Sequence, residues 1–369
     1  MTTISTFREF PFLLHQDERL LVTAAGSILT PYHAITNGSD GSGYHGNALT
    51  ILGSIISETG VGIFLNFFPY TGPSNDIVVI AAGGYVGAEA HNGAVGMCGD
   101  DNIFNNAGTV VGGGGLYFSN YRQGSIANSG SITGITLAAL HLDNGSTTTV
   151  TNTGVLQGVV GMELISSTAH VFNSGQILAT SEARAAVDAS LGTAGFILRN
   201  SGEISGPVKG ILGSAFADVI TNKGTVEGLI DLGAGADKFF GRLGTVDSKI
   251  SGGNDPDFIQ SGRGDDVVDG GSGNDTLSGN VGDDTLTGGS FADTFVFLRR
   301  GGDDVVTDFL HGTDKIDLKA FHFVNFAAVS GLLNAHPGGV ELDLTARLGG
   351  TVEFAGLTLA SLTASDFLI

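Results

Sequence analysis

The chain is poor in cysteine and in long apolar runs. Cys98 is the only cysteine among 369 residues, so no disulfide can form within the chain. If the protein works outside the cell, something other than disulfides must hold its fold together. No apolar run reaches the roughly 18 residues that a membrane-spanning helix needs, so we expect no membrane span.

The beginning of the chain lacks the features of an export leader. The stretch MTTISTFREFPFLLHQDERLL has neither a basic start nor a sustained apolar core. A Sec-type signal peptide needs both features. We therefore expect no Sec signal here.

Two common hydrolase motifs are also missing. The nine histidines are scattered, and the chain contains neither H-E-x-x-H nor G-x-S-x-G, which argues against a zinc protease and against the usual lipase elbow. A lyase or epimerase built on a β-solenoid needs only a cluster of Tyr, His, Lys or Arg. The stretch PYHAITNGSDGSGYHGN repeats Tyr-His twelve residues apart, which makes Tyr32, His33, Tyr44 and His45 candidates. Such residues are also typical of a capping loop, so the sequence assigns no catalytic residue and leaves enzyme activity open.

Positive charge is scarce as well. The chain has 16 Lys and Arg against 37 Asp and Glu, for a net charge of −21, and 27 of the acidic residues are Asp. Residues 231–317 hold 17 Asp, no Glu and seven Lys or Arg, a local net charge of −10. Nucleic acids reward Lys and Arg, so a nucleic-acid partner is excluded. The balance favours a cation as the partner.

A first internal repeat has a period near 22 residues. The phrase apolar-x-Asn-x-Gly-x-apolar recurs six times, around Asn106, Asn128, Asn152, Asn173, Asn200 and Asn222. Short apolar alternations with a fixed Asn-Gly corner predict the coils of a parallel β-solenoid, which must stack to bury their apolar faces. We expect the Asn side chains to form a hydrogen-bonded ladder. The Gly two residues later predicts a backbone angle that other residues resist. These residues are read as architectural, the alternative being a polysaccharide groove.

A second repeat has a period of nine. It reads GGNDPDFIQ, SGRGDDVVD, GGSGNDTLS, GNVGDDTLT and GGSFADTFV over residues 252–296, and an earlier copy, LGAGADKFF at 232–240, stands outside the strict register. Position six is always Asp and position eight is always apolar. The pattern resembles the RTX, or haemolysin-type, nonapeptide G-G-x-G-x-D-x-U-x, a motif known to bind Ca²⁺. Asp255 and Phe291 replace the Gly of position four, so we expect the first and last loops to bind calcium less well.

The resemblance implies a calcium-binding β-roll. Gly-rich turns offer backbone carbonyls, the Asp adds a carboxylate, and Ca²⁺ takes six to eight oxygens with tolerant geometry. Carboxylates about 5 Å apart on stacked turns repel by roughly 1 kcal/mol in water and roughly 3 kcal/mol at an effective dielectric of 20, and a divalent ion reverses that sign. The implied metal residues are Asp257, Gly262, Gly264, Asp266, Gly271, Gly273, Asp275, Gly282, Asp284, Asp293, Asp304 and Asp308.

The C-terminal part resembles the segment that closes the roll in secreted RTX proteins of the serralysin type. That segment, GGDDVVTDFLHGTDKIDLKAF, places Asp303, Asp304 and Asp308 near the last calcium loops by resemblance. The last four residues, Asp366 to Ile369, look like the uncleaved signal of substrates of type I ABC exporters. The implied partners are therefore calcium, such an exporter and, outside the cell, a polysaccharide or cell surface.

Together these patterns predict an all-β chain, a parallel β-helix that continues into a calcium-binding parallel β-roll. The expected parts are an irregular start or cap over 1–100, Asn-x-Gly coils over 101–230, an RTX roll over 231–300, and a cap with a secretion segment over 301–369. The expected function is a secreted protein that folds on calcium after export and has a structural, adhesive or glycan-binding role. The alternative is a polysaccharide lyase or epimerase with its groove in residues 1–230.

Overall fold

The computed structural model describes residues 1–8, 12–15, 18–30, 34–37, 46–58, 61–65, 75–88, 93–165 and 168–369. Its contacts divide the chain into two compact units. Unit 1 comprises Met1–Leu198 and Gly202–Gly210, and unit 2 comprises Arg199–Ser201 and Ile211–Ile369. The boundary expected at residue 230 falls inside unit 2.

Nearly all of the described elements are short β-strands. The first 22 are β1 (Thr2–Ile4), β2 (Phe7–Arg8), β3 (Phe12–Leu14), β4 (Arg19–Val22), β5 (Ser27–Thr30), β6 (Ile35–Asn37), β7 (Ala48–Ile51), β8 (Ser54–Ser57), β9 (Ile63–Leu65), β10 (Ile77–Ile80), β11 (Tyr85–Ala88), β12 (Gly93–Cys98), β13 (Asn102–Asn106), β14 (Thr109–Gly112), β15 (Gly114–Asn128), β16 (Ser131–Asn152), β17 (Val155–Leu164), β18 (Ala169–Asn173), β19 (Gln176–Ala179), β20 (Ala185–Asp188), β21 (Ile197–Asn200) and β22 (Glu203–Leu212).

The rest of the chain adds strands and a few short helices. The strands are β23 (Val219–Asn222), β24 (Thr225–Asp231), β25 (Lys238–Phe240), β26 (Thr245–Val246), β27 (Lys249–Asn254), β28 (Phe258–Arg263), β29 (Val267–Ser272), β30 (Thr276–Val281), β31 (Thr285–Ser290), β32 (Thr294–Val296), β33 (Asp304–Val306), β34 (Lys315–Asp317), β35 (Leu333–His336), β36 (Gly339–Asp343), β37 (Thr351–Ala355) and β38 (Phe367–Leu368). The helices are α1 (Phe326–Ser330) and the 3₁₀ turns η1 (Lys319–Phe321), η2 (Thr345–Arg347), η3 (Leu359–Ser361) and η4 (Ala364–Asp366). Within the described ranges, no helix has the length and apolar character needed to cross a bilayer.

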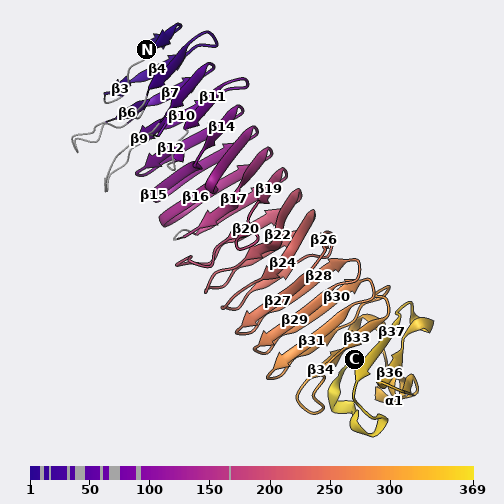
Figure 1. The fold of residues 1–369 in the computed structure, drawn as a ribbon. Coiled ribbons are helices and arrows are strands. Elements are labelled where there is room, and N and C mark those ends of the chain that lie inside the picture. The colour runs from indigo at the N-terminus through magenta and orange to yellow at the C-terminus, as the bar shows by residue number, and fades with distance from the viewer. Residues whose placement is uncertain are drawn as a thin grey trace. The chain divides into compact units, whose positions relative to one another are not determined.

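Unit 1 is a parallel β-solenoid with three strands to a coil. β10 pairs in parallel with β7 and β13, β11 with β8 and β14, and β12 with β9 and β15, so each strand contacts its equivalents one coil away. Figure 1 shows these coils stacked from indigo to magenta. Side chains alternate between inside and outside. One inward column runs through consecutive coils at Leu49, Val78, Phe104, Ile126 and Val150, all at most 1% exposed.

The expected Asn ladder is present inside the corner of these coils. Nδ2 of Asn106, Asn128 and Asn152 each donates to Oδ1 of the Asn one coil later, at 2.8 Å. In unit 2, Nδ2 of Asn200 donates to Oδ1 of Asn222 at 2.9 Å. The predicted backbone angle at the following Gly is wrong, because none of these glycines in unit 1 has a positive φ. Glycine is required at these positions because the neighbouring coil leaves no room for a side chain. A Cβ on Gly154, for example, would lie 2.0 Å from the carbonyl oxygen of Gly130.

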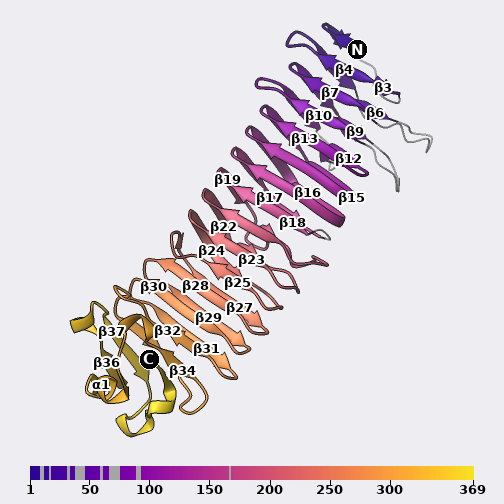
Figure 2. The same cartoon turned by 180° about the vertical axis from the view of Figure 1, so that it is seen from behind.

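Unit 2 is a narrower parallel solenoid with two strands to a turn. β28 pairs with β30, and β29 pairs with β31, each 18 residues along the chain, which is two nonapeptides. Figure 2 shows these strands stacked side by side in the orange part of the chain. The apolar residue of position eight fills the interior, as predicted. All six side chains at this position are 0% exposed: Phe239, Ile259, Val268, Leu277, Leu286 and Phe295.

The C-terminal segment closes unit 2 with a mixed pattern. β35, β36 and β37 pair antiparallel, whereas β37 also lies parallel to β33 and β38 lies parallel to β34. Asp366 is fully buried, and its carboxylate accepts hydrogen bonds from His311 Nδ1, the Gly312 N–H, and the N–H and Oγ1 of Thr363. The last residues are thus part of the folded cap. The predicted all-β fold with parallel solenoid coils is confirmed.

Candidate metal centre

Two columns of aspartates run along the roll in unit 2, each Asp lying at or just before the start of a strand. Because the chain alternates between the two strand layers, successive loops fall on opposite edges. Column A contains Asp218, Asp237, Asp257, Asp275, Asp293 and Asp314, and column B contains Asp266, Asp284 and Asp304.

Most of these carboxylates are held by the turn before them. The backbone N–H of Asp257 donates to Oδ1 of Asp275 at 2.8 Å, and the N–H of Asp275 donates to Oδ1 of Asp293 at 2.9 Å. Column B repeats this bond from Asp266 to Asp284 at 2.9 Å. In the aspartates held this way one oxygen is fixed, which orients the other, whereas Asp266, the first Asp of column B, has no such bond among the described residues.

At six of these aspartates, buried carboxylate oxygens lack a hydrogen-bond partner among the described residues. Seven carboxylate oxygens have no hydrogen-bond partner within the described part of the chain: Oδ2 of Asp237, Asp257, Asp275, Asp284 and Asp293, and both oxygens of Asp266. Their residues are 1–3% exposed. A buried, unpaired carboxylate oxygen is costly unless it is protonated or meets a cation. The repetition over six aspartates makes a common ligand the simplest explanation.

Glycines make room for these oxygens. A Cβ on Gly270 would lie 2.5 Å from Oδ2 of Asp275, and a Cβ on Gly288 would lie 2.4 Å from Oδ2 of Asp293. Gly270 and Gly288 are not among the glycines proposed from the sequence, which lie in the turns before their Asp. Gly262 and Gly264 precede Asp266, Gly271 and Gly273 precede Asp275, and Gly282 precedes Asp284. The structure therefore brings the predicted residues into the same loops.

The electrostatics of both columns favour protons or cations. Burial raises the pKa of Asp237 to about 8 and the pKa values of Asp257, Asp266 and Asp293 to about 7. Hydrogen bonds act against this rise, and neighbouring carboxylates add to it. Burial likewise raises the pKa of Asp284 to about 6 and that of Asp304 to about 7. A charged carboxylate here is unfavourable without a positive partner.

The chemistry of the site fits a hard cation such as Ca²⁺. Among the described residues, no three His, Cys, Asp or Glu side chains converge as a metal-binding group. A bound cation would therefore depend on backbone carbonyls from the Gly-rich turns together with the aspartates. Ca²⁺ accepts such mixed oxygen ligands, whereas Zn²⁺ prefers a closed set of four side chains.

The comparisons with known proteins agree with this geometry. A family model described as the RTX calcium-binding nonapeptide repeat, in four copies, matches residues 247–277 and 261–295. Residues 247–295 are RTX nonapeptide repeats. We call them the RTX region. The chain is thus a β-solenoid protein that carries calcium-binding repeats.

Two further comparisons add little. No curated protein matches the chain. Among solved structures, the solution structure of the AlgE6R3 subunit from the Azotobacter vinelandii mannuronan C5-epimerase is similar at 25% identity over 46% of this chain and 85% of that one. Its TM-score of 0.21 is too low to carry an argument.

Three aspartates after the RTX region bind backbone N–H groups. Oδ1 of Asp304 accepts from the N–H of Asp284 at 3.1 Å, which extends column B. The two oxygens of Asp308 accept from the N–H groups of Gly288 and Gly289, both at 2.8 Å. Oδ1 of Asp303 accepts from the N–H and Oγ1 of Thr351. Asp308 thus lies beside the last repeat, but both of its oxygens are already engaged.

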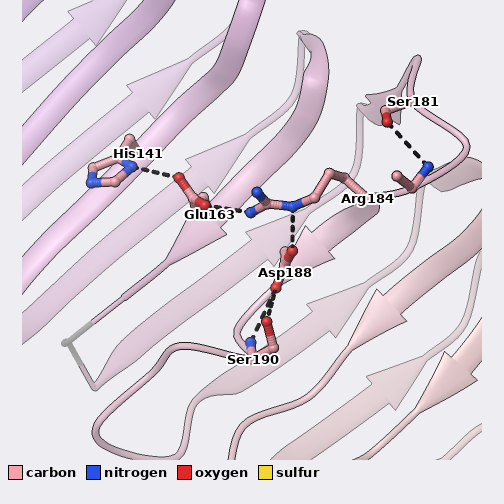
Figure 3. Close-up of polar contacts among 7 residues, drawn as sticks. His141, Glu163, Ser181, Arg184, Asp188 and Ser190 are labelled. Carbon is pink, nitrogen blue, oxygen red and sulfur yellow. Dashed lines mark hydrogen bonds and ion pairs between the residues drawn. The ribbon is translucent and has the colours of Figure 1, made fainter.

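Unit 1 carries a second polar cluster, which the sequence reading missed. His141 Nδ1 lies 2.7 Å from Glu163 Oε2, Glu163 also pairs with Arg184, and Arg184 Nε lies 2.9 Å from Asp188 Oδ2 (Figure 3). Tyr117 stacks on the His141 ring, with centroids 4.9 Å apart. Tyr117, His141, Glu163 and Asp188 occupy matching positions on four consecutive coils. Their spacing by one coil period was the available signal.

The sequence provides four further candidates. Tyr32, His33, Tyr44 and His45 lie outside the described residues. Cys98 lies on β12, and burial, with the Asp143 carboxylate adding to it, raises the pKa of its thiol to about 11. A thiol with so high a pKa stays protonated and is a poor nucleophile.

Proposed function

We propose that this protein is secreted, that calcium drives the folding of its roll outside the cell, and that it has an extracellular structural, adhesive or glycan-binding role. The carrying observation is the set of seven buried carboxylate oxygens without a partner within the described residues. Asp257, Asp266, Asp275, Asp284 and Asp293 would hold the ions, and the ions would supply the positive charge that the two columns lack. Calcium would thereby replace the disulfides that the chain cannot form.

The test is calcium binding by the whole purified chain. We expect calcium-free protein dialysed against millimolar Ca²⁺ to retain several ions per chain and to unfold at a higher temperature. Mg²⁺ is the control, since it demands a tighter octahedral geometry and holds its water strongly. Equal stabilisation by both ions, or no retained calcium, would contradict the proposal.

The secretion part of the proposal rests on the terminal residues and on mass action. A type I exporter would read Asp366 to Ile369 before folding, because in the folded cap Asp366 is buried and β38 is paired. Calcium is scarce in the cytosol and abundant outside. A ligand that binds only the folded state stabilises it by RT ln(1 + [L]/Kd). Folding outside the cell would then make export of the chain irreversible.

A polar depression on unit 1 supports contact with a glycan. It has a volume of about 470 Å³ and is lined by Asp101, Asn102, Gln123, Ser125, Thr147 and Thr149, among others. Such amide and hydroxyl groups hydrogen-bond sugar hydroxyls. We expect binding on a carbohydrate array, reduced by Gln123→Ala. Unchanged binding by this variant, or no bound glycan, would remove this surface from the proposal.

The second candidate function is a polysaccharide lyase or epimerase, favoured by the cluster around His141. A carboxylate on one ring nitrogen orients a histidine and leaves the other nitrogen available for proton transfer. We expect release of reducing or unsaturated sugar from a panel of polysaccharides, lost in His141→Ala and retained in His170→Ala, a histidine on β18 of the same unit. No turnover by the folded wild-type protein on any polymer would exclude this candidate.

A further inference from the structure

Two loops of unit 2 have nearly the same sequence but different hydrogen bonding. Residues 213–218 read GSAFAD and residues 288–293 read GGSFAD, and each ends on an Asp of column A. Oδ2 of Asp293 is buried without a partner among the described residues. By contrast, Oδ2 of Asp218 accepts from the Ser214 N–H at 2.8 Å and Oδ1 accepts from Ser214 Oγ at 3.0 Å.

The backbone explains the difference. In the second loop, Gly289 and Phe291 have φ values of +98° and +85°, the left-handed region that favours glycine. In the first loop, neither Ser214 nor Phe216 has a positive φ. Ser214 instead turns its N–H and hydroxyl onto the carboxylate. The protein itself thus supplies the donors that the carboxylate of Asp293 lacks.

The loop between them, LGAGAD at 232–237, follows the second pattern. Gly233 and Gly235 have φ values of +101° and +108°. Asp237 is 1% exposed, and its Oδ1 accepts from the N–H of Asp218 at 2.7 Å. Its Oδ2 has no partner in the described chain. This loop lies outside residues 247–295, which the RTX family model matches.

Asp314, at the other end of column A, resembles Asp218 in that both of its carboxylate oxygens accept hydrogen bonds. Oδ1 of Asp314 accepts from the N–H of Asp293 at 3.0 Å, and Oδ2 accepts from the N–H of Leu310 at 2.7 Å. Neither oxygen is left for a ligand. We call each Asp of column A, with its loop, a level. Column A therefore contains four levels with an unpaired carboxylate oxygen among the described residues, between two levels whose carboxylate oxygens both accept hydrogen bonds.

We propose that Asp237 forms a further calcium-binding level, and that Asp218 and Asp314 are metal-free ends of column A. The column of metal levels is then Asp237, Asp257, Asp275 and Asp293. Ser214 takes the place of the cation at the first end, and the Leu310 N–H takes it at the other. This inference rests on the proposed calcium binding of the RTX region.

The test counts calcium ions bound to the full chain by elemental analysis after equilibrium dialysis. Asp237→Asn should bind fewer ions than wild type, by the same amount as Asp275→Asn in the RTX region. Asp218→Asn should bind as many ions as wild type. A wild-type count for Asp237→Asn beside a reduced count for Asp275→Asn would overturn the inference alone. A wild-type protein without bound calcium would overturn the proposed function as well.

A second variant tests the metal-free end of column A independently of whether Asp237→Asn folds. Ser214→Gly removes the hydroxyl donor and restores the Gly found at the matching position 289. We expect this variant to bind more calcium than wild type. Oδ1 of Asp218 loses the hydroxyl donor, and glycine can adopt the positive φ of Gly289, which would turn the backbone N–H away from Oδ2. An unchanged count in Ser214→Gly, with normal strand signal in circular dichroism, would show that Ser214 does not replace a cation.

Discussion

The N–H of Asp275 donates a 2.9 Å hydrogen bond to Oδ1 of Asp293, one full turn later, while Oδ2 of Asp293 is buried and has no partner among the described residues. The same half-satisfied carboxylate recurs at almost every turn of the roll. Backbone bonds thus position the acids but do not neutralise them. Folding of the roll must therefore be coupled to a proton or to a cation.

The first prediction concerns two loops of the RTX region. Asp275→Ala should raise the calcium concentration needed for half-folding more than Asp257→Ala does. The loop before Asp275 keeps glycine at 271 and 273, whereas Asp255, before Asp257, takes a φ of +74° that strains a non-glycine residue. Calcium titrations followed by circular dichroism measure both midpoints. A larger shift for Asp257→Ala would contradict this ranking.

The second prediction concerns pH in calcium-free buffer. Burial raises the pKa values of Asp257, Asp266 and Asp293 from the ordinary 3.8 to about 7, so the folded roll binds more protons than the unfolded chain between these values. Its stability is then greatest at acid pH and falls as pH rises towards 7. Calorimetry of the calcium-free chain should show an unfolding transition of the roll at pH 5 that moves to lower temperature or is lost at pH 8. A Tm that rises across this window would be incompatible with the buried carboxylates.

Calcium should reverse the pH dependence of the stability of the roll. The ion competes with the protons for the same oxygens, so calcium affinity should rise with pH and binding should release protons. Titration calorimetry in buffers of different ionisation enthalpy measures that release. Binding without proton release near pH 6 would place calcium away from these aspartates.

The third prediction is that the Asn ladder stabilises unit 1 and does not bind calcium. Asn152→Ala removes the bonds to Asn128 and Asn173 and leaves buried polar groups unpaired, which costs about 1–3 kcal/mol in the free energy of unfolding. Thr153→Ala is the control, since its exposed side chain makes only a 3.4 Å contact with the Asn128 carbonyl. Urea denaturation measures the difference. A changed calcium count in Asn152→Ala would give the ladder another role.

The fourth prediction separates the export signal from the folded cap. Deleting residues 366–369 should trap the protein in cells that carry a type I exporter. Leu362→Ala is the matched control, because it loosens the same cap but keeps the terminal residues. The readout is the fraction of total protein in the medium. Equal trapping of both variants would assign the defect to folding, and normal export of the truncated chain would place the signal further upstream.

Much of the roll could be predicted because its chemistry repeats in sequence. The Asp of position six and the apolar residue of position eight keep a strict spacing, and Asp275 and Leu277 lie where that spacing places them. Asp237 lies in the copy LGAGADKFF, outside the strict register, and the metal residues implied by the motif begin only at Asp257. Whether an aspartate is free for a ligand depends on local donors such as Ser214, which the motif does not show.

Other features escaped the sequence reading for physical reasons. Tyr117, His141 and Glu163 are spaced by the coil period, but their residue types differ from coil to coil, so the spacing alone does not mark them as a repeated motif. The glycines after the ladder asparagines are expected from the sequence to allow an unusual backbone angle. Gly154 is instead needed because the preceding coil, at Gly130, approaches too closely for a side chain. The antiparallel pairing of β35, β36 and β37 follows no repeat.

The most direct test of the account is amide hydrogen exchange of the full chain, measured by mass spectrometry in millimolar calcium and in chelator at pH 7.5. Residues 258–296 should exchange slowly with calcium and fast in chelator, because the aspartates of both columns repel one another without the ion. Residues 93–165 of unit 1 serve as the internal reference and should exchange alike in both conditions. Equal protection of residues 258–296 with and without calcium would contradict calcium-driven folding of the roll.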